Sequence, residues 1–152
     1  MKKVINSFIN AVTGVYNAFR SERNLRFHFA VANLIVIFAY FYGLSKSEWA
    51  ILVIAISGVI TCEMLNTGIE RAVDTATSEY SETAKLAKDI SAGAVFVCAV
   101  FAIIIGFILF FDIARILKTL EYIFTDAKIL VPCLFIGIID IIIVVFGGKK
   151  ND

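Results

Sequence analysis

Charged residues are scarce in this chain, and the two signs nearly cancel. They make up 18% of the 152 residues, with 14 Lys and Arg against 13 Asp and Glu, so the formal charge is only +1. A nucleic-acid-binding protein needs a concentrated basic face, and this balance gives no sign of one. Hydrophobic residues reach 60%, well above the roughly half-apolar usage of soluble domains. This composition excludes a soluble monomer.

Cysteine and histidine are too few and too far apart for the common metal sites. The three cysteines lie at wide spacing inside apolar runs, without the pairs of a disulfide framework or zinc site, so we expect buried small side chains. The one histidine, His28, has no second histidine or cysteine near it, which argues against zinc and favours a hydrogen-bonding role at the membrane boundary. The patterns GxxxxGK[ST] and GxGxxG are also absent. Their absence excludes the P-loop, Rossmann and protein-kinase modes of binding nucleotide.

Long apolar runs are abundant, and we expect helices that cross the roughly 30 Å hydrocarbon layer of a membrane. The expected spans lie at about 27–44, 49–69, 90–111 and, more weakly, 129–146. The last one is short and contains Pro132 and Asp140. The sequence therefore predicts an all-α membrane protein with a membrane domain in residues 1–111 and a C-terminal extension in residues 112–152.

The N-terminal segment, at about residues 3–20, has the pattern of an amphipathic helix lying on the membrane surface. Polar side chains recur every three or four positions, and apolar side chains fill the opposite face with helical spacing. Lys2 and Lys3 precede apolar residues, as in a signal peptide, but the polar interruptions argue against one. A second surface helix is suggested by the spacing of Ile113, Ile116, Leu117, Leu120 and Phe124.

Basic residues near the ends of the spans predict the orientation of the chain. Ten of the 14 Lys and Arg residues lie in 1–28, in 70–89 or in the tail at Lys149 and Lys150. We therefore expect a multi-pass protein of the bacterial cytoplasmic membrane. The N-terminus, the 70–89 connection and the tail should face the cytoplasm.

A stripe of polar side chains follows the second expected span toward the cytoplasm. Asn66, Glu70 and Asp74 follow Glu63 at helical spacing, and at 100° per residue the four, with Thr67, share an arc of about 80°. A charged side chain inside a span costs about 2.5–3.5 kcal/mol on insertion scales, so each is a functional candidate. The stripe begins in the membrane interior and ends near water.

The geometry of this stripe suits a reaction at the membrane surface. Glu63 and Glu70 are separated by about 10.5 Å along the helix axis, which would place one carboxylate at headgroup depth and the other near the cytosol. A lipid hydroxyl could meet a cytosolic phosphate donor between them. The alternative is that the stripe faces neighbouring helices and only makes hydrogen bonds.

Further residues on the expected cytoplasmic side are candidates for binding phosphate or a metal ion. Lys88, at the membrane boundary, could hold phosphate as a point charge, or it could be an ordinary snorkelling lysine. Ser81 is expected to cap the helix that carries it. Glu22 and Glu70 could share a divalent cation such as Mg²⁺, although Glu22 could equally pair with Arg26 at i,i+4.

The stretch EMLNTGIERAVDTATSEYSETAKLAKDISAGAV, residues 63–95, resembles the signature of the small prokaryotic diacylglycerol kinase and undecaprenol kinase family. It preserves the pattern E-x-L-N-[ST]-x-I-E-x-x-V-D, then S-E-Y, then A-K-D. SERNLRFH, at 21–28, resembles the family's stretch ahead of the first span. The resemblance covers about residues 5–111.

The resemblance implies a lipid kinase that transfers the γ-phosphoryl group of ATP directly to a lipid alcohol. It implies that the protein is a homotrimer with sites shared between neighbouring subunits. It further implies that Glu63 is the general base, that Glu22 and Glu70 hold Mg²⁺ on the ATP phosphates, and that Asn66 orients or contacts the donor. The nucleotide-binding residues that it implies are Glu79, Tyr80, Ser81, Lys88 and Asp89.

The expected substrate rests on position 28, where members of the family differ. Some members carry an acid where His28 stands, and histidine there resembles the branch of Gram-positive-type bacteria, whose usual substrate is undecaprenol. We expect undecaprenol, with diacylglycerol as the alternative. A different class, an ion or proton carrier, should place acids at depth in several spans. Here only Glu63 and Asp140 are deep, which favours the kinase.

Overall fold

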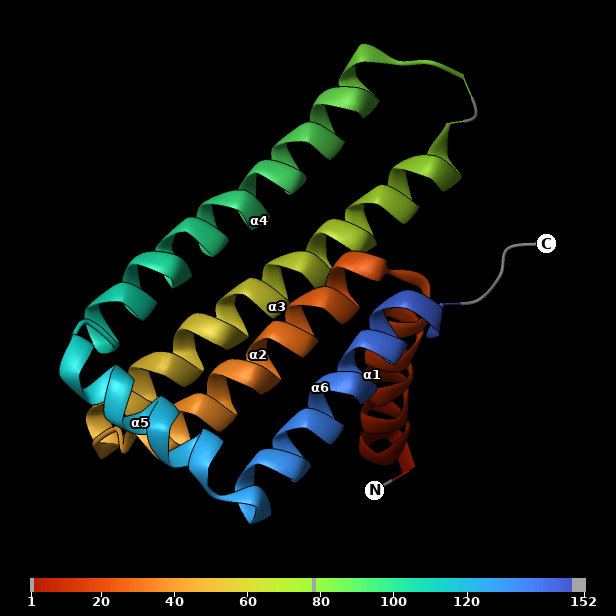
Figure 1. The fold of residues 1–152 in the computed structure, drawn as a ribbon. Helices are drawn as coiled ribbons and strands as arrows, with labels where there is room; N and C mark the ends of the chain where they lie inside the picture. The colour runs from red at the N-terminus through yellow and green to blue at the C-terminus, as the bar shows by residue number, and fades with distance from the viewer. Residues whose placement is uncertain (1, 78, 149–152) are drawn as a thin grey trace.

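The structure is a computed structural model that describes residues 2–77 and 79–148, and it is helical from end to end (Figure 1). The helices in chain order are α1 (Lys2–Ser21), α2 (Arg23–Tyr42), α3 (Lys46–Ala76), α4 (Glu82–Leu109), α5 (Ile113–Thr125) and α6 (Ala127–Phe146). Four of them, α2, α3, α4 and α6, are long and apolar enough to cross a membrane. The predicted all-α fold with four candidate spans is confirmed.

Two of the spans extend further than the apolar runs predict. α3 continues past 69 to Ala76, and α4 begins at Glu82, with the Ser81 hydroxyl accepting a hydrogen bond from the Ala84 amide at 3.4 Å. Hydropathy detects where a helix leaves the hydrocarbon, whereas the helix itself ends only where its backbone hydrogen bonds stop. α3 and α4 therefore form a long hairpin that projects beyond the rest of the bundle (Figure 1).

The helices are arranged around α2 and α3. α4 packs along α3, α2 lies between α3 and α6, and α5 crosses one end of the bundle on its way to α6 (Figure 1). α1 meets α2 and α3 at the other end. The C-terminal helices thus pack directly on α2, while the division into a membrane domain and an extension at residue 112 stays a prediction.

The end of the bundle near α5 is held by a small buried cluster. An αL glycine, Gly43 with φ 77°, ends α2, and a capping box of Ser45 and Glu48 begins α3. Arg115 of α5 lies 4.2 Å from the centroid of the Tyr42 ring and donates from Nε to the Tyr42 carbonyl at 2.9 Å. The buried side chains of the cluster are Ala39, Tyr42, Leu44, Leu52 and Leu109.

Most apolar side chains of the spans point outward. Only 6% of the most apolar stretch of α4, and the same share of α6, is buried within the chain. Such surfaces suit contact with lipid or with neighbouring subunits. The orientation of the chain in the membrane stays a prediction, as do the surface positions of α1 and α5. Lys149 and Lys150, which contribute to the orientation, lie outside the described residues.

The cysteines are half-buried instead of fully buried. Cys62 of α3 and Cys98 of α4 face each other with their Sγ atoms 3.1 Å apart. A separation of 36 positions in the sequence gave no sign of this contact, which depends on the register of the α3–α4 hairpin.

Candidate active site

The inner part of the polar stripe of α3 lies inside the bundle, whereas Asp74 at its outer end is exposed. Glu63, Asn66 and Thr67 are all buried, and only 4% of Glu63 is exposed. A helix of a soluble protein buries its apolar face. Here most apolar side chains of the spans are exposed, and α3 buries a polar face instead. Burial of a carboxylate in a span is costly, so its position calls for polar partners or a function.

The groups around Glu63 come from two helices. Asn24 and His28, one turn apart on α2, lie in the neighbourhood of the Glu63 carboxylate, as do Glu22 and Glu70. The three carboxylates of Glu22, Glu63 and Glu70 therefore lie in one region, while the shared cation of Glu22 and Glu70 stays a prediction. Asn24 carried no signal of its own in the sequence, because its contribution depends on how α2 packs on α3.

A chain of hydrogen bonds links α4 to Glu70. The Ser91 hydroxyl lies 2.6 Å from Oδ1 of Asn66 and 2.9 Å from the Lys88 carbonyl oxygen. Asn66 then donates from Nδ2 to Oε1 of Glu70 at 3.0 Å. Ser91 is buried and fixes which end of the Asn66 amide faces Glu70. Ser91 was not predicted from the sequence. It is a small polar residue one turn past Lys88 in an apolar run, and the sequence carries no other signal for it.

Glu22 lies at the elbow between α1 and α2, as the single residue that separates them. Its Oε1 atom is 3.5 Å from Nη2 of Arg71 on α3, and the same guanidinium group donates to the Ser21 hydroxyl. Glu22 therefore pairs with Arg71, and the alternative pairing with Arg26 is wrong. Arg26 instead donates to backbone carbonyls of α1.

The carboxylates of this region suit a hard cation with few protein ligands. Among residues 2–77 and 79–148, three or more His, Cys, Asp or Glu side chains do not gather into a metal cluster. Mg²⁺ does not require one, because it is usually held by one or two carboxylates together with waters and substrate phosphates. Glu22 and Glu70, with the Asn66 amide beside Glu70, fit that donor set.

Lys88 has a partner across the α3–α4 hairpin. Lys88 of α4 forms an ion pair with Asp74 of α3, so it is not simply snorkelling toward water. Asp89, the next residue, is exposed. The pair lies on the face of the α3–α4 hairpin that continues outward from Glu70.

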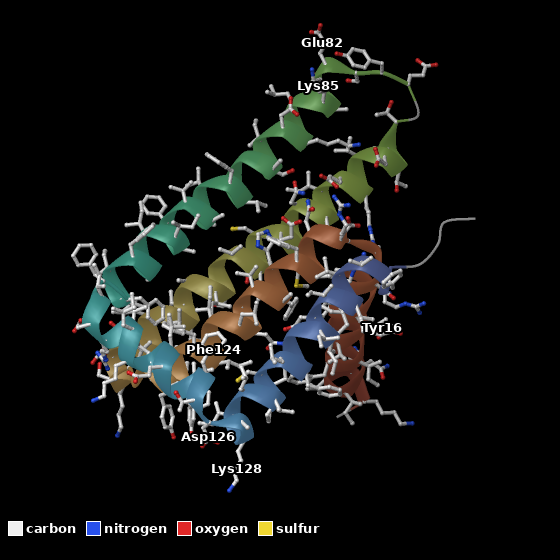
Figure 2. The ribbon with its side chains drawn as sticks, in the orientation of Figure 1. Tyr16, Glu82, Lys85, Phe124, Asp126 and Lys128 are labelled. Carbon is white, nitrogen blue, oxygen red and sulfur yellow. The ribbon has the colours of Figure 1, made fainter. Side chains whose placement is uncertain are left out.

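The remaining predicted residues lie at the tip of the hairpin, away from Glu63. Glu79 and Tyr80 are exposed in the α3–α4 connection, and Ser81 caps α4. Figure 2 shows the neighbouring Glu82 and Lys85 at the far end of the molecule from Phe124, Asp126 and Lys128. The structure thus gathers Glu22, Glu63, Asn66 and Glu70, and it leaves the connection residues apart from them.

Comparison with known proteins places the chain in a family. The family model for prokaryotic diacylglycerol kinase matches residues 9–110. The undecaprenol kinase of Bacillus subtilis is 41% identical over 110 residues, which cover 72% of this chain and 89% of that protein. Diacylglycerol kinases of Synechocystis and Haemophilus influenzae are 39% and 30% identical, over 66% and 71% of this chain and 58% and 92% of their own lengths. No solved structure matches the chain significantly.

The match runs from within α1 to the end of α4 and contains every candidate residue described above. Family members are lipid kinases, and a kinase uses ATP as its phosphate donor. The chain therefore belongs to the prokaryotic diacylglycerol kinase family and is a multi-pass membrane lipid kinase.

Proposed function

We propose that this protein phosphorylates undecaprenol, using ATP and Mg²⁺, to give undecaprenyl phosphate. The observation that carries the proposal is the buried carboxylate of Glu63 on the same helix face as the hydrogen-bonded pair Asn66–Glu70. Seven residues of α-helix separate the two acids by about 10.5 Å. That distance spans the boundary where an alcohol in the bilayer meets a donor from water.

Glu63 is the general base in this proposal. It accepts the proton of the lipid hydroxyl as the oxygen bonds to the γ-phosphorus and the bond to the ADP oxygen breaks. Asn24 and His28, both within electrostatic range of Glu63, are placed to orient the hydroxyl. Because the site is buried among helices, water is kept from competing with the lipid.

Glu22 and Glu70 hold Mg²⁺, and Asn66 contacts the donor. When bound, the ion neutralises charge on the ATP phosphates. Arg71, which pairs with Glu22, keeps that carboxylate turned toward α3. The two carboxylates come from the α1–α2 elbow and from α3, so the donor set depends on how these elements pack.

Ser91→Ala tests the orientation of Asn66. Without the hydroxyl, the Asn66 amide is free to rotate, and we expect the KM for MgATP to rise about two- to tenfold, the worth of one hydrogen bond. Ser57→Ala is the matched control, because the Ser57 hydroxyl donates to the Ile54 carbonyl one turn back on its own helix, α3. Steady-state kinetics at varied ATP measures both. An unchanged KM in the Ser91 variant would remove Asn66 from the donor site.

The nucleotide lies along the α3–α4 hairpin in this proposal. Lys88 exchanges Asp74 for a phosphate when ATP binds, and Asp89 contacts the nucleotide beside it. Glu79, Tyr80 and Ser81 in the connection line the outer part of the pocket. Exposure of Glu79 and Tyr80 leaves them accessible to a ligand arriving from water.

Two facts favour undecaprenol over diacylglycerol. The undecaprenol kinase of Bacillus subtilis shares 41% identity over 89% of its length, and His28, in the neighbourhood of Glu63, stands where some family members carry an acid. Diacylglycerol remains the second candidate, because the relatives from Synechocystis and Haemophilus influenzae are diacylglycerol kinases.

We further propose a homotrimer in the bacterial cytoplasmic membrane, with the N-terminus and active site facing the cytoplasm. The basic residues that flank the α1–α2 elbow, and those near the end of α3 and the start of α4, support this orientation. The outer surface of α4 is left uncovered by the chain itself, which leaves room for subunit contacts. Residues 1–111 form the kinase domain in this proposal, and residues 112–152 are an extension.

A competition assay tests substrate and class together. Purified protein receives radiolabelled ATP with undecaprenol and diacylglycerol in equal amounts in the same micelles, with a Glu63→Gln sample as the blank. We expect undecaprenyl phosphate as the main product. A majority of phosphatidic acid would make diacylglycerol the substrate, and ion flux through reconstituted vesicles without ATP would instead favour a carrier.

A further inference from the structure

The C-terminal helix α6 is fixed along α2 at a definite register. The two run antiparallel and side by side (Figure 1), and Asn33 donates from Nδ2 to Oδ1 of Asp140 at 3.2 Å. Only 6% of Asp140 is exposed. A hydrogen bond between polar side chains in a span holds two helices in one alignment.

This alignment brings the end of α6 to Arg26. From Asn33 back to Arg26 is seven residues of α2, and from Asp140 on to Gly147 is seven residues of α6, so each step is about two turns along the same helix face. A Cβ on Gly147 would lie 3.3 Å from Cδ of Arg26, and one on Gly148 would lie 2.9 Å from its Nη2. The chain therefore approaches the Arg26 side chain closely where it has two glycines.

Arg26 joins the end of α6 to the end of α1. Its Nη1 donates to the carbonyl oxygens of Phe19 at 3.2 Å and Arg20 at 3.0 Å, the last turn of α1. Only 5% of the residue is exposed. A cation is favoured at a helix C-terminus, where the macrodipole is negative, and here one guanidinium lies at two such ends.

The elbow that Arg26 closes is the one that carries Glu22. Glu22 is the only residue between α1 and α2, and its amide donates to the Ala18 carbonyl at 2.9 Å. The direction of its carboxylate therefore follows the angle between the two helices. Arg71 holds the elbow from α3, and Arg26 holds it from the side of α6.

We propose that Arg26 is a positioning residue, held between the C-terminal ends of α1 and α6, through which the C-terminal extension sets the direction of Glu22 in the active site. The extension lies outside the part of the chain that matches the family, residues 9–110. The inference rests on the proposed role of Glu22 in holding Mg²⁺. In this proposal α6 contributes to MgATP binding indirectly, through Arg26 and the direction of Glu22.

Arg26→Lys and Gly148→Val in the full chain test the proposal. Lysine keeps the charge but loses the planar guanidinium group whose Nη1 atom reaches two carbonyls, and valine at position 148 displaces that group. We expect each change to raise the KM for MgATP about tenfold while kcat changes less than about twofold, because binding geometry alone is altered. The matched control is Gly137→Val on α6, where an added Cβ meets nothing within 4 Å. A purely structural defect would reduce the amount of active enzyme, lowering kcat at unchanged KM, and would overturn the proposal.

Hydrogen–deuterium exchange separates this proposal from the proposed role of Glu22. We expect both variants to speed exchange at the elbow amides, including that of Glu22, with no change in the Gly137→Val protein. If exchange at the elbow stays as in the unmodified protein, Arg26 does not hold the elbow, and the inference is wrong whatever Glu22 does. If Glu22→Gln itself leaves the KM for MgATP unchanged while elbow exchange rises in both variants, the proposed function of Glu22 fails, and the effect of the extension on MgATP fails with it. If only Arg26→Lys acts on the elbow, the link to α6 is overturned.

Discussion

Glu63→Gln should stop phosphoryl transfer while leaving the donor bound. We expect kcat to fall by about 10²–10⁴-fold, the usual contribution of a general base, because glutamine keeps the shape of the side chain but cannot take up the hydroxyl proton. The KM for MgATP should change by less than about twofold, since Glu70 is two turns away on the same face. Kinase assays with saturating lipid and varied ATP measure both constants.

Glu48→Gln is the matched control for this change. It is the same substitution on the same helix, in the first turn of α3, where the Glu48 carboxylate accepts from the Ser45 amide at 2.7 Å. Glutamine can still accept that hydrogen bond in a capping box, so activity should be unchanged. Near-normal turnover by the Glu63 variant would show that another group takes the proton.

The residues that the sequence could predict are those that share one helix. Glu63, Asn66 and Glu70 fall on one face of α3 because a helix repeats every 3.6 residues, so their spacing alone predicts a common side. Glu63 and Asn66 are buried and Glu70 is half-buried, which agrees with that prediction. The four apolar spans could be predicted in the same way, because length and composition decide whether a helix can cross the hydrocarbon.

The contacts between helices could not be predicted from spacing. Ser91 reaches Asn66 from α4, and Arg71 reaches Glu22 across the elbow, and both depend on the register in which two helices pack. The pairing of Asn33 with Asp140 is of the same kind. A polar residue in a span is expected to have a polar partner, but its position in the sequence does not indicate which helix supplies that partner.

α6 illustrates how tertiary context overrides a local rule. Pro132 lies inside the helix, where proline removes a backbone donor and crowds the preceding turn. The helix nevertheless continues to Phe146, because spanning helices tolerate proline when neighbouring groups and small local adjustments satisfy the freed carbonyl. The span expected at 129–146 is weak by its length and by Pro132 and Asp140, and the structure confirms that it is a helix.

Removing the carboxylates proposed to hold Mg²⁺ should have the second large effect. For Glu22→Gln and for Glu70→Gln we expect the KM for MgATP to rise about 10- to 100-fold, or about 1.4–2.7 kcal/mol, and the Mg²⁺ concentration for half-maximal rate to rise with it. Glutamine keeps the size of each side chain, and at position 70 it can still accept from Asn66. Mg²⁺ titrations at fixed ATP measure the shift, with Glu121→Gln on α5 as an unaffected control.

The double variant decides whether the two carboxylates share one ion. If both carboxylates bind the same cation, removing either one already weakens that binding. The loss of Mg²⁺ affinity in the double variant Glu22→Gln with Glu70→Gln should then be smaller than the two single losses combined. Independent losses would place the two acids in separate roles. Arg71→Gln provides the last control, because it breaks the ion pair with Glu22 and keeps both carboxylates. If that variant reproduced the full loss of Mg²⁺ affinity, Glu22 would act through the packing of the elbow and not as a ligand.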